Sequence, residues 1–197
     1  MKFSKQLSAI VMSLAFAACA VAGDLVTKQT ASTSATACAL VFGPAAGKMT
    51  VKNVQTSCDS PLGAVTFYAR SGNKVSPTSA TTAIATEIAV PTGHGMTTND
   101  LVVYVWANGT APVLRTVSDC TTTSITVVAI GTVGTTSDKI YEVSAQGKII
   151  VAGNSAAAGT NTLGNYPGDL FATPGDSPLY VTMSSVTNTC LQVTVEK

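Results

Sequence analysis

Apolar and polar residues alternate along many short segments of the chain. The alternation is clearest where Val65, Phe67 and Ala69 are separated by polar or aromatic residues, and again at Leu191, Val193 and Val195. A period of two places such residues on one face of a strand, so each segment predicts a half-buried β-strand. We expect strands at residues 49–54, 65–70, 87–90, 101–106, 113–117, 124–130, 139–143, 148–152, 179–183 and 191–195.

Turn residues separate these segments, and no segment beyond residue 22 has a convincing helical period. Asn108-Gly109 stands between two of the expected strands, and this dipeptide favours a type I′ hairpin turn with positive φ at both central residues. Residues 71–83 and 153–178 are expected to be loops. Many short strands joined by Gly, Asn and Pro predict an all-β fold, an antiparallel β-sandwich with an inserted small β-barrel.

The inserted unit is suggested by residues 93–145. They contain Asn99-Asp100 before a strand, the stretch TVSDCTTTSITVV, and Ser137-Asp138 before "KIYEV". This order resembles small β-barrel modules of bacteriophage virion surface proteins and other secreted bacterial proteins, which have Gly-Asp where this chain has Asn99-Asp100 and Ser137-Asp138. The resemblance implies a fold and no catalytic residue. We therefore expect a sandwich of residues 38–90 and 148–197 around a barrel of residues 91–147, with one continuous sheet as the alternative.

The N-terminus has the layout of a secretory signal peptide. Lys2 and Lys5 precede the apolar run 10–18, and Ala20-Val21-Ala22 forms a cleavage site, so residues 1–22 are expected to be removed. The run is too short for a transmembrane span. Lipidation at Cys19 is the alternative, because residues 16–19 resemble a bacterial lipobox. The polar residues 23–37 that follow are expected to form an extended N-terminal arm.

Charge is scarce and nearly balanced. Charged residues make up 11% of the 197 residues, and without Lys2 and Lys5 the chain has nine basic and ten acidic residues. No basic patch is present, which argues against nucleic acid as a partner. A weakly charged surface rich in Thr, Ser, Asn and Gly favours association, although an ordinary secreted β-domain could have the same composition.

Four cysteines remain beyond the signal peptide: Cys38, Cys58, Cys120 and Cys190. An even number in an exported chain predicts two disulfides, with three pairings to choose from. The pairing that we favour joins Cys38 to Cys58 and Cys120 to Cys190. No C-x-x-C spacing is present and His94 is the only histidine, so a zinc site is not expected.

Residues suited to catalysis are few. His94 lies between two glycines, and no G-x-S-x-G elbow supplies a nucleophile. Asp169 and Asp176 each follow a Pro-Gly dipeptide, a pattern typical of tight turns. Calcium binding by these two carboxylates is the alternative. We expect no enzyme activity, no cofactor and no metal.

One surface could bind a ligand. Tyr104, Trp106 and Asn108 cluster at the predicted hairpin, where an exposed ring pair would stack on a sugar. The alternative is that both rings pack on the sheet. Asn108-Gly109-Thr110 also fits a glycosylation sequon, but the turn explains these residues better.

These observations predict an exported structural or adhesive protein, secreted or on a bacterial cell surface. It could be a subunit of a filament, sheath or surface layer, with copies of itself or another surface component as partners. The arm at 23–37 could complete a neighbour's sheet, although it lacks the alternating apolar residues of a donor strand. The alternative is a secreted glycan- or protein-binding β module.

Overall fold

The computed structural model describes residues 23–32, 38–58, 62–152, 162–184 and 189–197. Within these ranges the protein contains strands and turns and no helix, which confirms the all-β prediction. The strands are β1 (Leu25–Ser32), β2 (Cys38–Phe42), β3 (Thr50–Cys58), β4 (Leu62–Val75), β5 (Glu87–Ala89), β6 (Leu101–Val105), β7 (Val113–Cys120), β8 (Ser124–Val127), β9 (Lys139–Ala152), β10 (Thr162–Ala172), β11 (Leu179–Ser184) and β12 (Thr189–Glu196). The predicted signal peptide lies outside the described residues.

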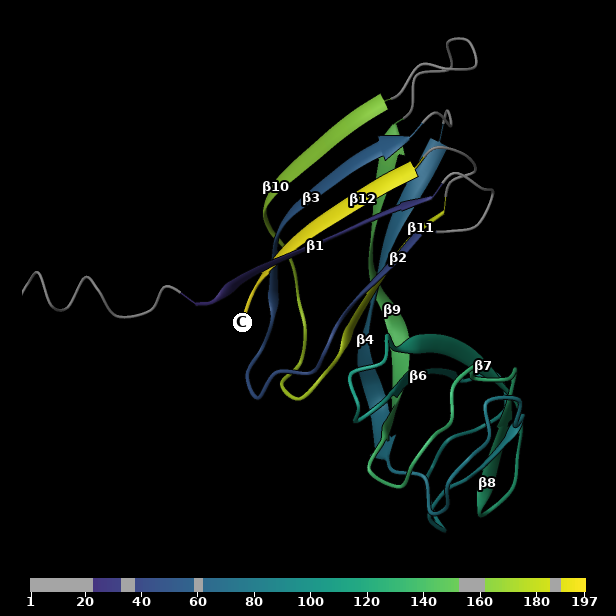
Figure 1. Cartoon of the computed structure of the whole chain (residues 1–197). Coiled ribbons are helices and arrows are strands. Elements are labelled where there is room, and N and C mark those ends of the chain that lie inside the picture. The colour runs from purple at the N-terminus through teal and green to yellow at the C-terminus, as the bar shows by residue number, and fades with distance from the viewer. Residues whose placement is uncertain (1–22, 33–37, 59–61, 153–161, 185–188) are drawn as a thin grey trace, which may run out of the picture.

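The strands form two antiparallel sheets (Figure 1). The smaller sheet has the order β1-β12-β3-β10, and the larger has the order β2-β11-β4-β9-β6-β7-β8-β5. The end of the larger sheet that contains β6, β7, β8 and β5 curls into a half-barrel, whereas the β2 end lies beside the smaller sheet (Figure 1).

The first core lies between the smaller sheet and strands β2, β4 and β11. Val65 and Phe67 enter it from β4, and Leu191 and Val193 enter it from β12, each at most 1% exposed. The predicted inward faces of these two strands are therefore confirmed. Burial of apolar surface contributes roughly 25 cal/mol per Å², so this core is a main source of stability.

The second core fills the inside of the curl. Ile88 comes from β5, Val102 and Tyr104 from β6, Ile125 from β8 and Ile140 from β9, each at most 2% exposed. A smaller third cluster of Val103, Tyr141 and Val143 lies on the other face of β6 and β9.

Strands β4 and β9 run through both halves, and each is 14 residues long. Their pairing shifts where Gly147 lies opposite Phe67 and Ala145 lies opposite Tyr68, which leaves Gln146 as an extra residue. Such a bulge bends a strand and increases its twist. The two strands predicted at 139–143 and 148–152 are thus one bent strand, because the Gly147 region bulges and does not turn.

Two segments expected to lack strands are strands at the ends of the smaller sheet. Residues 25–32 of the predicted arm pair with β12 over their whole length, and residues 162–172 of the predicted loop pair with β3. The backbone pairing of an end strand does not require a buried apolar face, so neither sequence shows strong alternation. The other residues of the arm beyond Ser32 lie outside the described residues.

The hairpin between β6 and β7 exists, with Tyr104 opposite Val113, but its turn is not type I′. The backbone N–H of Gly109 donates to the Trp106 carbonyl at 3.3 Å, and only Gly109 of the two expected residues has a positive φ, at 83°. The connection spans residues 106–112, and this longer loop does not need the left-handed conformation at Asn108.

Candidate functional site

The predicted sugar-binding surface at the hairpin is not formed. Tyr104 and Trp106 are 1% and 3% exposed and belong to the second core, with ring centroids 4.7 Å apart. The curl of the sheet wraps both rings, so neither face is open to a sugar. Asn108 is exposed, and its Oδ1 accepts a 3.0 Å hydrogen bond from the Thr110 N–H. A local turn contact therefore explains Asn108.

Asp138 is a buried carboxylate beside these rings. It is 1% exposed and accepts hydrogen bonds from the Tyr104 hydroxyl (2.8 Å), the Ala107 N–H (2.8 Å) and the Thr135 N–H (2.7 Å). Burial by itself would raise the pKa of Asp138, but these donors hold that pKa below its ordinary value. Burial and the neighbouring carboxylate raise the pKa of the Tyr104 phenol. The satisfied carboxylate fixes the turn before β9 and has no free lone pair directed at solvent.

The same turn occurs before β6. Asp100 accepts from the Thr97 N–H at 2.6 Å, as Asp138 does from Thr135. In both turns the aspartate N–H also donates to the threonine carbonyl at 3.2 Å. The sequence contains this repeat as TTND and TTSD at residues 97–100 and 135–138, and the two aspartates stabilise backbone turns.

His94 is buried, and its contacts are structural. Its Nδ1 accepts from the Met96 N–H at 3.1 Å, so Nε2 carries the hydrogen donated to the Thr121 carbonyl at 2.8 Å. Gly93 and Gly95 on either side have φ values of 76° and 74°. Neither contact supplies a nucleophile or an orienting carboxylate, so these contacts do not form a catalytic triad.

Asp169 and Asp176 belong to separate ion pairs. Asp169 contacts Lys52 at 2.7 Å, whereas Asp176 contacts Lys74 at 2.6 Å and Arg70 at 3.5 Å. The carboxylates raise the pKa of Lys52 and of Lys74 through hydrogen bonds. No group of three acidic, Cys or His residues that could hold a metal occurs in the described part of the chain. The arrangement gives the calcium alternative no support.

Cys120 is a free thiol, partly exposed at the end of β7. The favoured pairing of Cys120 with Cys190 is therefore wrong. Cys120 lies on the curled end of the larger sheet and Cys190 lies on β12 of the smaller sheet, which keeps the two strands apart. The predicted link between Cys38 and Cys58 stays a prediction, because their side chains are outside the described structure.

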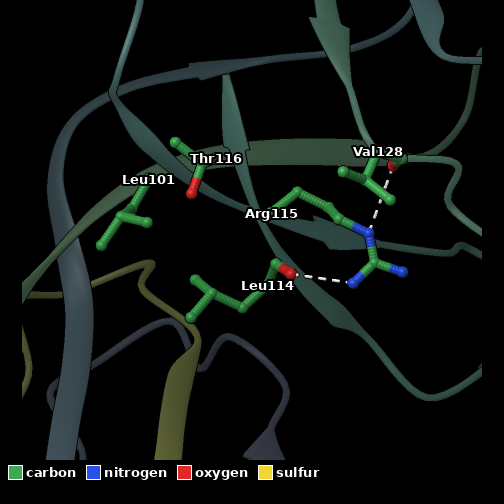
Figure 2. A pocket seen from close by; sticks show the side chains of 5 residues that line it. All are labelled: Leu101, Leu114, Arg115, Thr116 and Val128. Carbon is green, nitrogen blue, oxygen red and sulfur yellow. Dashed lines mark hydrogen bonds between the residues drawn. The ribbon is translucent and has the colours of Figure 1, made fainter. Parts of the chain in front are cut away.

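A shallow hollow lies on the outside of β6 and β7 (Figure 2). Its lining residues are Leu101, Leu114, Arg115, Thr116 and Val128. The Arg115 guanidinium donates to the carbonyls of Leu114 at 2.9 Å, Val128 at 3.2 Å and Ala129 at 3.1 Å. These bonds fasten β7 to the segment after β8. The lining has no aromatic ring and no acid–base group, so it suits neither a sugar nor catalysis.

The strongest candidate site is the side of the molecule where both sheets end. β1 is the end strand of the smaller sheet and β2 is the end strand of the larger one, and they lie side by side (Figure 1). Lys28 of β1 donates to the Val41 carbonyl of β2 at 2.5 Å, and its ammonium lies 5.4 Å from the Phe42 ring centroid. β2 has the uncharged sequence CALVF. We call this surface, formed by β1 and β2, the open side.

The other end strands, β10 and β5, have features that hinder pairing with another chain. β10 contains Pro167, which has no N–H, and its pairing with β3 shifts between Pro167 and Phe171, with the exposed Asp169 between them. β5 has only three residues and begins with the exposed Glu87. Proline, bulges, charge and short length are the devices that prevent end strands from pairing with other chains. Lys28 is the one charged residue of β1 and β2, and neither strand contains a proline or a bulge, but β2 is only five residues long.

The sequence showed no direct sign of the open side. Its two strands are the polar segment LVTKQTAS and the short run CALVF, and neither carries a motif. The available signal for an end strand was the short uncharged run CALVF, which is followed by Gly43-Pro44.

No protein-family model matches the chain, and no curated protein matches it. Among solved structures, T=1 particles derived from infectious bursal virus are 10% identical over 88% of this chain and 40% of that chain, with a TM-score of 0.15. The VP2 subviral particle of infectious bursal disease virus is 14% identical over 89% and 41%, with a TM-score of 0.14. The chain spans less than half the length of these proteins, and at such TM-scores the likeness carries no argument.

Proposed function

We propose that this protein is an exported structural subunit of a bacterial extracellular or cell-surface assembly, and that copies join at the open side. The observation that carries the proposal is the contrast among end strands. β1 and β2 are adjacent and little protected, whereas β10 and β5 are blunted by Pro167, Asp169 and Glu87. An unprotected end strand is a template for pairing with another chain.

The composition supports association and export. Only 11% of the residues are charged, so repulsion between copies is weak. The predicted signal peptide would direct the chain out of the cytoplasm. No helix in the described part of the chain is long and apolar enough to cross a membrane.

We also infer that the fold consists of a sandwich around the first core and an inserted barrel around the second. The separate buried clusters support this division.

A charge placed on the open side tests the proposal. Residues 23–197, wild type and Ala39→Lys, would be compared by sedimentation velocity and negative-stain electron microscopy. Ala39 is an exposed residue of β2, and a lysine on an end strand opposes pairing with another chain. Val133→Lys is the matched control, because Val133 is 59% exposed in the loop before β9.

We expect wild type and Val133→Lys to form ordered oligomers and Ala39→Lys to remain monomeric. A wild-type protein that stays monomeric at every concentration would refute self-assembly and favour the alternative, a secreted glycan- or protein-binding module. Equal loss in both lysine variants would refute the open side as the contact.

A further inference from the structure

We propose that β1 of one molecule leaves its own β12 and pairs with β12 of a second copy. This inference rests on the proposed function and names the joint by which the copies are held. The open side could instead join two intact sheets edge to edge, with each β1 remaining in its own molecule. The two arrangements differ in which β12 each β1 contacts.

β1 is held to the rest of the chain mainly through its backbone. All eight residues are paired with β12, from Leu25 opposite Glu196 to Ser32 opposite Thr189. Of its described apolar side chains, Val26 packs against the first core and Leu25 is 66% exposed, while the Lys28 ammonium lies over the Phe42 ring. Removing β1 would uncover the surface beneath Val26 and Lys28 but leave most of the core covered, because the neighbouring β12 fills it with buried side chains of its own.

The remaining contacts of β1 can be made equally well in a second copy. The hydroxyls of Thr27 and Thr194 are 2.9 Å apart across β1 and β12, and Lys28 reaches the carbonyl of Val41. An exchanged β1 would form the same backbone ladder with the identical β12 of its neighbour. Exchange of an identical element is consequently a low-cost route to association.

The length of the chain between β1 and β2 permits the exchange. Six Cα steps separate Ser32 from Cys38, and extended chain covers at most about 3.6 Å per residue, or roughly 20 Å. Packed sheets are about 10 Å apart, so a connection of this length can span the spacing between a sheet of one molecule and a sheet packed against it from another. β1 also directly follows the predicted cleavage site at Ala22, which would leave its other end unattached.

Cysteine pairs across β1 and β12 test the proposal. Thr27 and Thr194 are register partners, so Thr27→Cys and Thr194→Cys place two thiols where the hydroxyls meet. Both changes are made in a Cys120→Ser/Cys190→Ser background, which removes the free thiol of the described structure and the β12 cysteine that the favoured Cys38–Cys58 link leaves without a predicted partner. Chains with only Thr27→Cys are mixed in denaturant with chains that have only Thr194→Cys, refolded together and oxidised.

Exchange predicts a disulfide between the two chains, which peptide mass spectrometry would locate at positions 27 and 194. Each single variant oxidised alone is the control and should give no such link. Absence of the link in a mixture that has assembled would overturn the proposal, because β1 then stays on its own β12.

A locked variant separates this inference from the proposed function. Thr27→Cys/Thr194→Cys is oxidised at high dilution, so that β1 is fixed to its own β12, and is then concentrated. The control Thr66→Cys/Thr182→Cys joins β4 to β11, where these residues are partners, and leaves β1 and β2 unchanged.

We expect oligomers to be lost in the locked variant, to return on reduction, and to persist in the control. A locked variant that assembles as well as wild type would overturn strand exchange while leaving self-assembly intact. A wild-type protein that never assembles would overturn both.

Discussion

The Tyr104 hydroxyl donates a 2.8 Å hydrogen bond to Oδ2 of Asp138, a carboxylate that is 1% exposed. Ala107 and Thr135 donate backbone N–H groups to the same side chain. One aspartate thereby joins the end of β6, the hairpin loop and the turn before β9. The curled half of the larger sheet depends on this contact as well as on its apolar core.

Replacing Asp138 with Asn should destabilise the protein. The asparagine amide would direct its NH2 group at one of two backbone donors, which leaves a buried N–H without an acceptor. We expect a loss of about 2 kcal/mol in the free energy of unfolding, measured by urea denaturation. Asp100→Asn is the matched control, because Asp100 is more exposed and its bond to Thr97 can be kept by an amide oxygen. Equal losses in the two variants would contradict a special role for Asp138.

The lowered pKa of Asp138 also predicts acid sensitivity. A carboxyl whose folded pKa lies below the ordinary value of 3.8 stabilises the fold above that pH, and this stabilisation is lost as the pH falls through the folded pKa. The difference in unfolding free energy between wild type and Asp138→Asn should be constant from about pH 7 to about pH 5 and shrink below about pH 4. A difference that grew on acidification would have the wrong sign.

Trp106 should act as a core residue. Trp106→Ala is expected to lower the free energy of unfolding by about 3–5 kcal/mol, because the ring is 3% exposed. Trp106→Phe should cost less, since Nε1 is buried with no hydrogen-bond partner in the described structure. The exposed Asn108, replaced by Ala, provides the control at the same hairpin. If Trp106→Ala left thermal stability unchanged, an exposed sugar-binding ring would be the better explanation.

Asn99 has a φ of 77°, which lies in the left-handed region that glycine adopts most easily. Asn99→Gly should be tolerated, whereas Asn99→Ala should cost about 1 kcal/mol, because a Cβ disfavours the left-handed region. Ser137 occupies the equivalent position of the second turn without a positive φ, so Ser137→Gly should not stabilise. Thermal denaturation of the three variants tests the comparison, and a stabilising Ser137→Gly would contradict it.

The sequence predicted strands well where one face of a strand is buried. Phe67 and Val193 lie in alternating segments because the first core requires apolar side chains at every second position. β1, β2 and β10, which are all end strands, were missed. β1 and β10 are held by backbone pairing that any polar sequence can make, and β2 is a run of five residues with only Leu40 and Phe42 buried. The Gln146-Gly147 dipeptide was interpreted as a turn between two strands, although it is a bulge within β9. Bulges and turns use similar residues, so the sequence did not distinguish them.

The candidate site was harder to predict than the fold. Alternation at Tyr104 and Trp106 does not indicate which face of a strand is covered, and the curl of the sheet decided that both rings are buried. The open side depends on which strands end each sheet, a property of the topology and not of any local motif. The repeated aspartate turns were visible in the sequence, but their bonds required the structure.

The cysteines give a last prediction. Because Cys120 is free and partly exposed, iodoacetamide should label it in the native, unreduced protein. Peptide mapping should also recover the predicted link between Cys38 and Cys58, which begin β2 and end β3 on opposite sheets and would join those sheets covalently. Loss of that link by Cys58→Ser should lower stability by roughly 3 kcal/mol, whereas Cys120→Ser should have little effect. A mapped Cys120–Cys190 peptide would contradict the free thiol and require the curled end to contact the smaller sheet.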